Sequence, residues 1–270
     1  MTVREIACKS ALCETGLPAD YAINCYVGCE HACAYCYARY MKRFTGHREP
    51  WGTFVDVRVN APEVLAREVK RKPPASVMLS SVCDGWQPLE EKYRASGQCV
   101  ETLARSGWHV SILTKGALVR RDLPLLEGKP ADLGMTLTAW DEKLRRAIEP
   151  GASSTAERLD VLKEAAGRRI PIWVFIGPLL PLLTDTMENL EPLFAAVAEL
   201  PITHLHTDRV NFRSGVAASL KAMVRNRFPR LDDDYLWLGS DGDEDQAYAD
   251  QLQSRLEVVA ARYGLAGKMR

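Results

Sequence analysis

The sequence has no net charge, because 35 Lys and Arg residues balance 35 Asp and Glu residues in a chain of 270. This balance excludes the binding of nucleic acid or membrane through an overall basic surface, although a local basic patch is compatible with it. Runs of about 18 or more apolar residues are also absent, so we expect no transmembrane helix and no membrane partner. Residues 1–16 lack the apolar core of a signal peptide, from which we expect a cytoplasmic protein.

Cysteine is absent from the last 171 residues, and four of the eight cysteines, at 25, 29, 33 and 36, fall within twelve residues. Secreted proteins held together by disulfides are usually short and spread their cysteines along the chain. A chain of this length forms a core without such bonds. The clustering therefore favours metal-bound thiolates in a reducing compartment. The spacings of Cys8, Cys13 and Cys25 match no standard motif, and we expect free thiols there.

Short apolar, β-branched runs alternate with helical patterns along the chain. Strands are predicted at about 21–28, 75–82, 109–113, 133–138, 170–176 and 203–207. Helices are predicted at about 35–43, 61–71, 93–106, 120–126, 141–147, 154–166, 187–200, 215–226 and 244–263. Six such repeats predict an α/β fold, a partial (β/α)6 barrel of parallel strands with outer helices. We expect one domain over 1–270, with 1–20 as an N-terminal extension and about 231–270 as an acidic turn followed by a helix.

Cys29, Cys33 and Cys36 form a C-x3-C-x2-C motif on a loop after the first predicted strand. These spacings let one short loop direct three thiolates toward one metal centre. An iron–sulfur cube normally takes four cysteines, so three leave one iron open to a chelating amine and carboxylate. The alternative is a structural zinc site with Cys25 or His31 as fourth ligand, although zinc sites typically use paired C-x2-C knuckles.

With Tyr35 just before the third cysteine, this motif resembles the signature of the radical S-adenosylmethionine (radical SAM) superfamily. Residues 24–39 are similar to its spore photoproduct lyase-like branch, many members of which are labelled DNA repair photolyases. Further matching blocks follow in order at 84–90, 113–115, 149–151, 177–181 and 211–215. The resemblance implies an enzyme with a [4Fe–4S] cluster, S-adenosylmethionine and an electron donor such as flavodoxin or ferredoxin. It also implies reductive cleavage of S-adenosylmethionine to a 5′-deoxyadenosyl radical that abstracts hydrogen from a substrate.

The resemblance also implies roles for side chains near the predicted strand ends, with Cys29, Cys33 and Cys36 as the cluster ligands. Lys115 would pair with the carboxylate of S-adenosylmethionine, and Ser81 and Asp84 would bind its amino group. Thr136 would bond its methionine or ribose portion, and Tyr35 would pack beside the cluster and the adenine. The structural alternatives are a surface lysine, a turn aspartate, a threonine facing the core edge and a core aromatic residue.

Cys83 lies next to the position of the hydrogen-donating cysteine of spore photoproduct lyase, which aligns at or beside Val82. By this resemblance the Cys83 thiol would return a hydrogen atom to a substrate radical, whereas the alternative is a small buried hydrophobe. Other polar residues lie near the later strands. We expect satisfied polar side chains at His204 and His206, an ion pair between Glu149 and Arg158, and contacts with an anionic substrate as an open alternative at Arg209, Asn211 and Arg213.

Two enzymatic functions fit this sequence: a radical SAM enzyme with a small or medium-sized substrate, and a DNA lesion repair lyase of the spore photoproduct lyase type. An enzyme that binds duplex DNA needs several Lys or Arg residues for phosphates and must extrude a damaged base into a pocket. The basic stretch 39–48 is modest and the net charge is zero, so nucleic acid is the less favoured partner. A zinc-stabilised, non-enzymatic binding module is the third hypothesis.

Overall fold

Six parallel strands form the main sheet of the computed structural model, which describes residues 1–212, 215–235 and 243–270. The strands pair in chain order, with the antiparallel β2 (Cys13–Glu14) added at one edge. The parallel strands are β3 (Tyr21–Ile23), β6 (Ser76–Leu79), β7 (His109–Thr114), β8 (Ala131–Leu137), β9 (Ile172–Leu179) and β10 (Leu205–Arg209). The fold is therefore α/β, a partial barrel with six parallel strands, as the sequence predicts.

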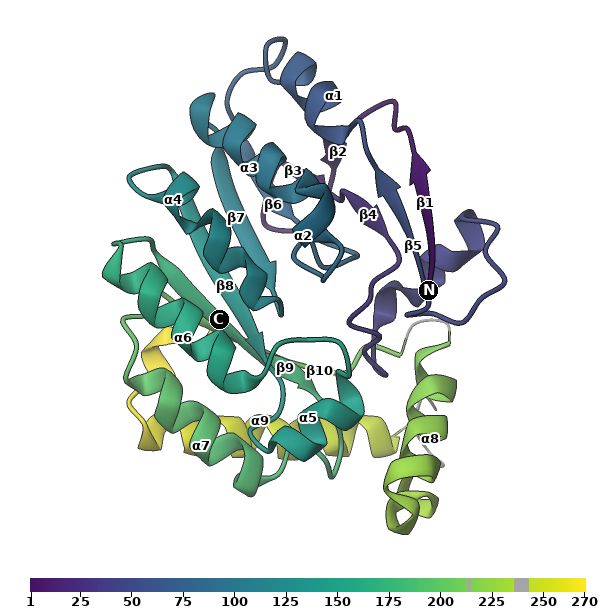
Figure 1. The fold of residues 1–270 in the computed structure, drawn as a ribbon. Helices are drawn as coiled ribbons and strands as arrows, with labels where there is room; N and C mark the ends of the chain where they lie inside the picture. Colours follow the sequence, from purple (N-terminus) through teal and green to yellow (C-terminus); the bar gives the residue numbers. More distant parts are fainter. Residues whose placement is uncertain (213–214, 236–242) are drawn as a thin grey trace.

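Helices lie along the outer side of the curved sheet (Figure 1). The α-helices are α1 (Ala61–Glu68), α2 (Glu90–Tyr93), α3 (Ala95–Arg105), α4 (Leu123–Leu126), α5 (Glu142–Ile148), α6 (Thr155–Gly167), α7 (Met187–Ala198), α8 (Val216–Arg227) and α9 (Asp243–Arg262). Short 3-10 helices are η1 (Tyr37–Phe44), η2 (Ala117–Asp122), η3 (Pro229–Leu231), η4 (Asp233–Tyr235) and η5 (Ala266–Lys268). Among the described helices none is long and apolar enough to cross a membrane.

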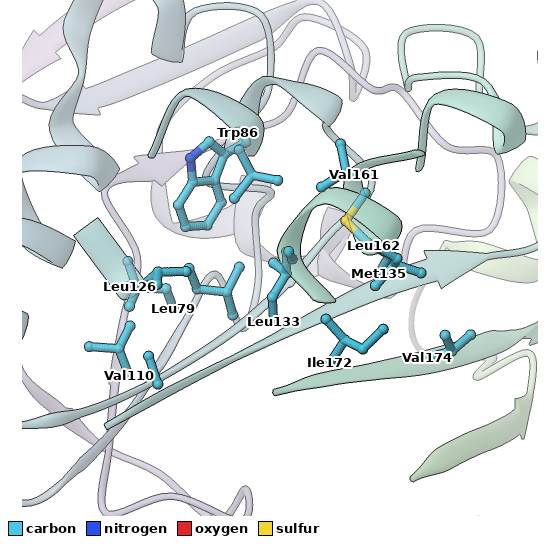
Figure 2. Close-up of a cluster of buried hydrophobic side chains, with 14 of the residues drawn as sticks. Leu79, Trp86, Val110, Leu126, Leu133, Met135, Val161, Leu162, Ile172 and Val174 are labelled. Carbon is cyan, nitrogen blue, oxygen red and sulfur yellow. The ribbon is translucent and has the colours of Figure 1, made fainter. Parts of the chain in front are cut away.

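The two faces of the main sheet have different chemistry because side chains alternate along each strand. Figure 2 shows apolar side chains of β8 and β9, such as Leu133 and Ile172, packed with Val161 and Leu162 of α6. Asp132 and Thr136 of β8 alternate with these residues and face the barrel interior. The outer face thus builds the core, whereas the inner face carries polar side chains together with apolar ones such as Phe175 and Trp173.

The predicted strand 21–28 is wrong as a single element. It is divided between β3, in the main sheet, and β4 (Tyr26–Val27), which pairs with β5 (Phe54–Arg58) in a second, three-stranded sheet. Asn24 lies at the break, where its side chain accepts a hydrogen bond from Val82 N and donates one to Ser81 Oγ. These bonds to the end of β6 replace ladder bonds and let the chain leave the main sheet.

Residues 1–20, expected as an extension, contribute a strand to each sheet. β1 (Thr2–Ile6) pairs in parallel with β5, and β2 pairs with β3. Two expected helices also differ: 35–43 contains the 3-10 helix η1, and 93–106 is divided into α2 and α3 at Arg94, which has φ +52°. Part of the predicted acidic turn, residues 236–242, lies outside the described residues.

Candidate active site

A cavity of about 360 Å³ lies at the carboxyl ends of the main strands, where active sites of barrel proteins form. Below it, the Trp173 ring fills the barrel interior against Gly134 and donates a hydrogen bond to Asp132. The cavity is lined by all nine residues selected from the sequence: Cys29, Cys33, Cys36, Tyr35, Ser81, Cys83, Asp84, Lys115 and Thr136. The fold therefore brings together side chains that are more than 100 positions apart in sequence.

The loop that carries the three cysteines is held in place by its own backbone contacts. Gly28 has φ +95°, a conformation that favours glycine, and a Cβ there would overlap the Phe54 carbonyl. The Arg39 guanidinium donates hydrogen bonds to the carbonyls of Cys33, Ala34 and Cys36 at 3.1 Å. These bonds satisfy carbonyl groups that a tight loop would otherwise leave unpaired.

The block 84–90 holds the same loop from the side of the main sheet. Gln87 is fully buried; its Oε1 accepts a hydrogen bond from Glu30 N at 2.8 Å, and its Nε2 donates one to the Gly28 carbonyl at 3.3 Å. Glu30 in turn accepts a hydrogen bond from Leu89 N at 2.5 Å. The block 84–90 therefore positions the cysteine loop.

The thiols of this loop are poorly solvated. Burial, with Asp84 and the other thiols nearby, raises the pKa of Cys29 well above its ordinary value. Burial also raises the pKa of Cys33 to about 12, although Lys115 lowers it. Such thiols become thiolates when a metal cation coordinates them. The loop is thus suited to thiolate ligation, with cationic groups close to its sulfurs.

The donor arrangement fits an iron–sulfur cube better than a zinc ion. Among the described side chains, no three of His, Cys, Asp or Glu converge closely enough to hold a single metal ion. Tetrahedral zinc requires such convergence, whereas a cube distributes its cysteine ligands over separate irons. The zinc interpretation is therefore unsupported by the geometry.

Asp84 joins three segments of the site. Its carboxylate accepts hydrogen bonds from Thr114 Oγ1 at 2.5 Å and from the backbone N–H groups of Trp86 and Lys115 at 2.9 and 2.8 Å. His31 Nδ1 lies 3.4 Å from it. Burial opposes ionisation, but His31 and Lys115 hold the pKa of Asp84 below its ordinary range. The turn role of Asp84 is thus present, and its contact with a ligand amine stays a prediction.

Lys115 places its ammonium 5.9 Å from the centre of the Tyr35 ring, and in the described part of the chain no carboxylate forms an ion pair with it. Burial opposes its charge, but Cys33, Glu149 and Asp84 together raise the pKa of Lys115. The cavity wall therefore carries a charged ammonium that is available to an anionic group.

Tyr35 is buried, and its hydroxyl forms hydrogen bonds with residues that do not line the cavity. Its hydroxyl donates to Glu149 and lies 3.2 Å from Thr138 Oγ1. Glu149 forms the expected ion pair with Arg158 at 2.5 Å, and both side chains are fully buried. Burial alone would raise the pKa of Glu149, but Arg158 and Lys115 lower it to about 2. This network braces the wall behind the cysteine loop.

Ser81, Thr136 and Cys83, the remaining predicted site residues, differ in how far their polar groups are already hydrogen-bonded within the protein. The Ser81 hydroxyl oxygen accepts a hydrogen bond from Asn24 Nδ2 at 2.9 Å, and the Ser81 carbonyl accepts one from the Tyr37 hydroxyl. Thr136 has no hydrogen bond from its hydroxyl to any described residue, so that group is open to a ligand. Cys83 is 5% exposed, and burial, with Cys36 nearby, raises the pKa of its thiol, which keeps the S–H proton at neutral pH.

Polar residues in and beside β10 divide into two groups. His204 and His206 face the same side, with ring centres 4.9 Å apart. His204 stacks on Trp173, His206 meets that ring edge-on, and neither histidine lines the cavity. Arg209 and Asn211 do line it, whereas Arg213 lies outside the described residues. His31 also lines it, although its sequence position indicated only a candidate zinc ligand.

Comparisons with known proteins agree with this site. Residues 23–193 match the family model described as the radical SAM superfamily. An uncharacterized protein of Mycobacterium tuberculosis (strain H37Rv) is 31% identical over all of this chain and 83% of its own length. An uncharacterized protein of Methanocaldococcus jannaschii is 33% identical over 67% of this chain and 69% of its own length.

Solved structures share the fold at low sequence identity. Spore photoproduct lyase complexed with a dinucleoside spore photoproduct matches with a TM-score of 0.69 and 15% identity, over 98% of this chain and 80% of that chain. Streptococcus suis SuiB bound to S-adenosylmethionine matches with a TM-score of 0.52 and 11% identity, over 79% of this chain and 47% of that chain. The chain belongs to the radical SAM superfamily and is an enzyme of that class.

Proposed function

We propose that the protein binds a [4Fe–4S] cluster through Cys29, Cys33 and Cys36 and cleaves S-adenosylmethionine reductively. The observation that carries this proposal is that these cysteines and the predicted cofactor-binding residues line the same cavity. When bound, the cluster supplies one electron to the sulfonium of S-adenosylmethionine, which yields methionine and a 5′-deoxyadenosyl radical for hydrogen abstraction. A flavodoxin or ferredoxin would deliver the electron, and the eight free cysteines support a reducing compartment such as the cytoplasm.

Three side chains are proposed to orient S-adenosylmethionine. The Lys115 ammonium binds its carboxylate, because this cation faces the cavity with no ion-pair partner among the described residues. The Thr136 hydroxyl bonds the methionine or ribose portion from the inner face of β8. Asp84, with the Ser81 segment beside it, presents an anionic edge to the amino group, and Tyr35 supports the wall near Lys115.

Cys83 is proposed to donate a hydrogen atom within the cavity. Its burial keeps the thiol protonated, and hydrogen-atom donation requires an intact S–H bond. In D₂O and without added substrate, 5′-deoxyadenosine formed by the wild-type protein should therefore carry deuterium from the exchanged thiol. Cys83→Ala should lower the deuterium content, measured by mass spectrometry, without lowering cluster content. Equal deuterium content in both proteins would contradict this role.

A small or medium-sized substrate is favoured over duplex DNA. The zero net charge provides no overall basic surface for phosphates. DNA lesion repair has the likeness of fold to spore photoproduct lyase and the resemblance of residues 24–39 in its favour, and it is the second candidate.

Cluster ligation is tested by single replacements of the three cysteines. After anaerobic reconstitution, the wild-type protein should contain about four irons and four sulfides and absorb in the visible range. Cys29→Ala, Cys33→Ala and Cys36→Ala should each lose most of the iron and all cleavage activity. The matched control is Cys13→Ala, because Cys13 is an exposed free thiol. Full iron content in all three ligand variants would refute the assignment.

A further inference from the structure

An open groove of about 550 Å³ lies beside the cysteine loop and outside the active-site cavity. Its lining includes four residues of η1 and one of the segment that follows: Arg39, Tyr40, Lys42, Arg43 and His47. Tyr37 and Ala38, at the start of η1, line the cavity, and the two hollows share no lining residue. A molecule held in the cavity would therefore leave this groove open.

The groove belongs to a local basic patch in a chain without net charge. Residues 39–50 contain four Lys or Arg residues and one acidic residue, Glu49. The Glu49 carboxylate accepts hydrogen bonds from His47 Nδ1 at 3.1 Å and from Arg48 N at 2.9 Å. Lys42 Nζ donates to the Arg48 carbonyl at 3.0 Å. Among the described residues no carboxylate forms an ion pair with the Lys or Arg side chains of this stretch, so its positive charge is open to a partner.

An exposed aromatic ring lies among these cations. Phe44 is 66% exposed. The Arg43 guanidinium lies 4.6 Å from the centre of the Phe44 ring and 5.5 Å from that of Tyr40. Arginine and aromatic side chains are enriched in protein interfaces. The patch thus combines charge that attracts an acidic protein with a ring that such a protein can cover.

Arg39 joins this patch to the cysteine loop. Its guanidinium donates hydrogen bonds to the carbonyls of Cys33, Ala34 and Cys36, and the same side chain lines the groove. Cys36 directly precedes η1. A protein seated on the groove would therefore contact the side chain that bonds the cysteine peptides. Such a position suits an electron donor, which must approach the cluster without occupying the cavity.

We propose that the basic patch of residues 39–48 is the docking surface for an acidic electron-transfer protein, which passes one electron to the cluster. The donor loses that electron and the cluster gains it, with no transfer of atoms. This inference rests on the proposed function, since it requires a cluster that is reduced. A basic surface with exposed rings also suits a nucleic-acid strand. A nucleic-acid substrate, however, must enter the cavity, which the groove does not share.

Binding of an oxidised, acidic flavodoxin to the reconstituted protein tests the proposal. The double variant Lys42→Glu, Arg43→Glu should bind about tenfold more weakly at low ionic strength, because attraction becomes repulsion. Added salt should weaken binding of the wild-type protein more than that of the variant. The matched control is Lys129→Glu, which reverses an exposed charge just before β8 and should bind normally. Equal affinities of wild type and double variant would overturn the inference.

Electron transfer gives a second readout. Iron content and full reduction by excess dithionite show that the double variant retains its cluster, whereas its reduction by reduced flavodoxin should be about tenfold slower than in the wild type. Equal rates would contradict docking at this patch. Loss of affinity for a single-stranded oligonucleotide, with flavodoxin binding unchanged, would assign the patch to nucleic acid instead.

The outcomes separate this inference from the proposed function. Wild-type protein that assembles no cluster would contradict the proposed function before any donor is added. Cluster-loaded protein that binds neither an acidic flavodoxin nor an acidic ferredoxin would overturn the docking surface alone.

Discussion

Lys115 shows how the surroundings of one side chain determine what it can bind. Thiol and carboxylate groups keep it charged, yet none of the described carboxylates forms an ion pair with it. A charge-assisted hydrogen bond contributes about 1.5–3 kcal/mol, and about 1.4 kcal/mol is tenfold in affinity. Lys115→Ala should therefore weaken binding of S-adenosylmethionine by tenfold or more, measured by calorimetry on cluster-loaded protein. Lys129→Ala, at an exposed position, is the control; equal affinities would argue against Lys115.

Individual site residues could be found from the sequence where a motif places them shortly after a strand. Asp84 and Lys115 follow β6 and β7, and both line the cavity. The role of Asn24 could not be predicted from the motif that contains it, because its hydrogen-bonding partners lie more than 50 residues away in the sequence. Pairs that meet across long sequence separations leave no local pattern.

At the scale of elements, the cysteine loop is rigid because neighbouring segments hold it. Gly151 N donates a hydrogen bond to the His31 carbonyl at 3.1 Å, and Ala34 N donates one to the Ile148 carbonyl at 2.9 Å. The segment after α5 therefore packs directly on this loop. The buried pair of Glu149 and Arg158 fixes that segment in turn.

Gly151→Ala tests the importance of this packing. A Cβ at this position would overlap the Glu30 carbonyl, so the cysteine loop must shift. We expect a loss of about 1–3 kcal/mol in the free energy of unfolding, with less iron bound after reconstitution. Gly167→Ala, where nothing lies within 4 Å of the added carbon, should leave both unchanged or raise stability slightly. The two variants should differ in chemical denaturation and in iron content; identical behaviour would contradict this packing argument.

Most elements could be predicted because their patterns are local. The capping box of Ser154 and Glu157 marks the start of α6, and the sequence places that start within one residue. The strand predicted at 21–28 was wrong because a side chain, Asn24, ends β3 inside an apolar run. β5 was not predicted, although it contains Phe54, Val55 and Val57, which are residue types typical of strands.

At the scale of the whole molecule, the six strands run parallel, so their carboxyl ends all lie at one rim of the sheet. This order follows from the strand–helix alternation, so the fold class and the position of the site could both be predicted. The identity of the substrate could not, because it depends on the shape and charge of the cavity between distant segments. The neutral net charge favours a small molecule over DNA.

Formation of 5′-deoxyadenosine is the most direct test of the central claim. The anaerobically reconstituted protein, reduced with dithionite and supplied with S-adenosylmethionine, should release 5′-deoxyadenosine and methionine in equal amounts. Chromatography with mass spectrometry measures both, and Cys33→Ala should form neither. Absence of 5′-deoxyadenosine from wild-type protein whose cluster is shown to be reduced by electron paramagnetic resonance would contradict the proposed reaction.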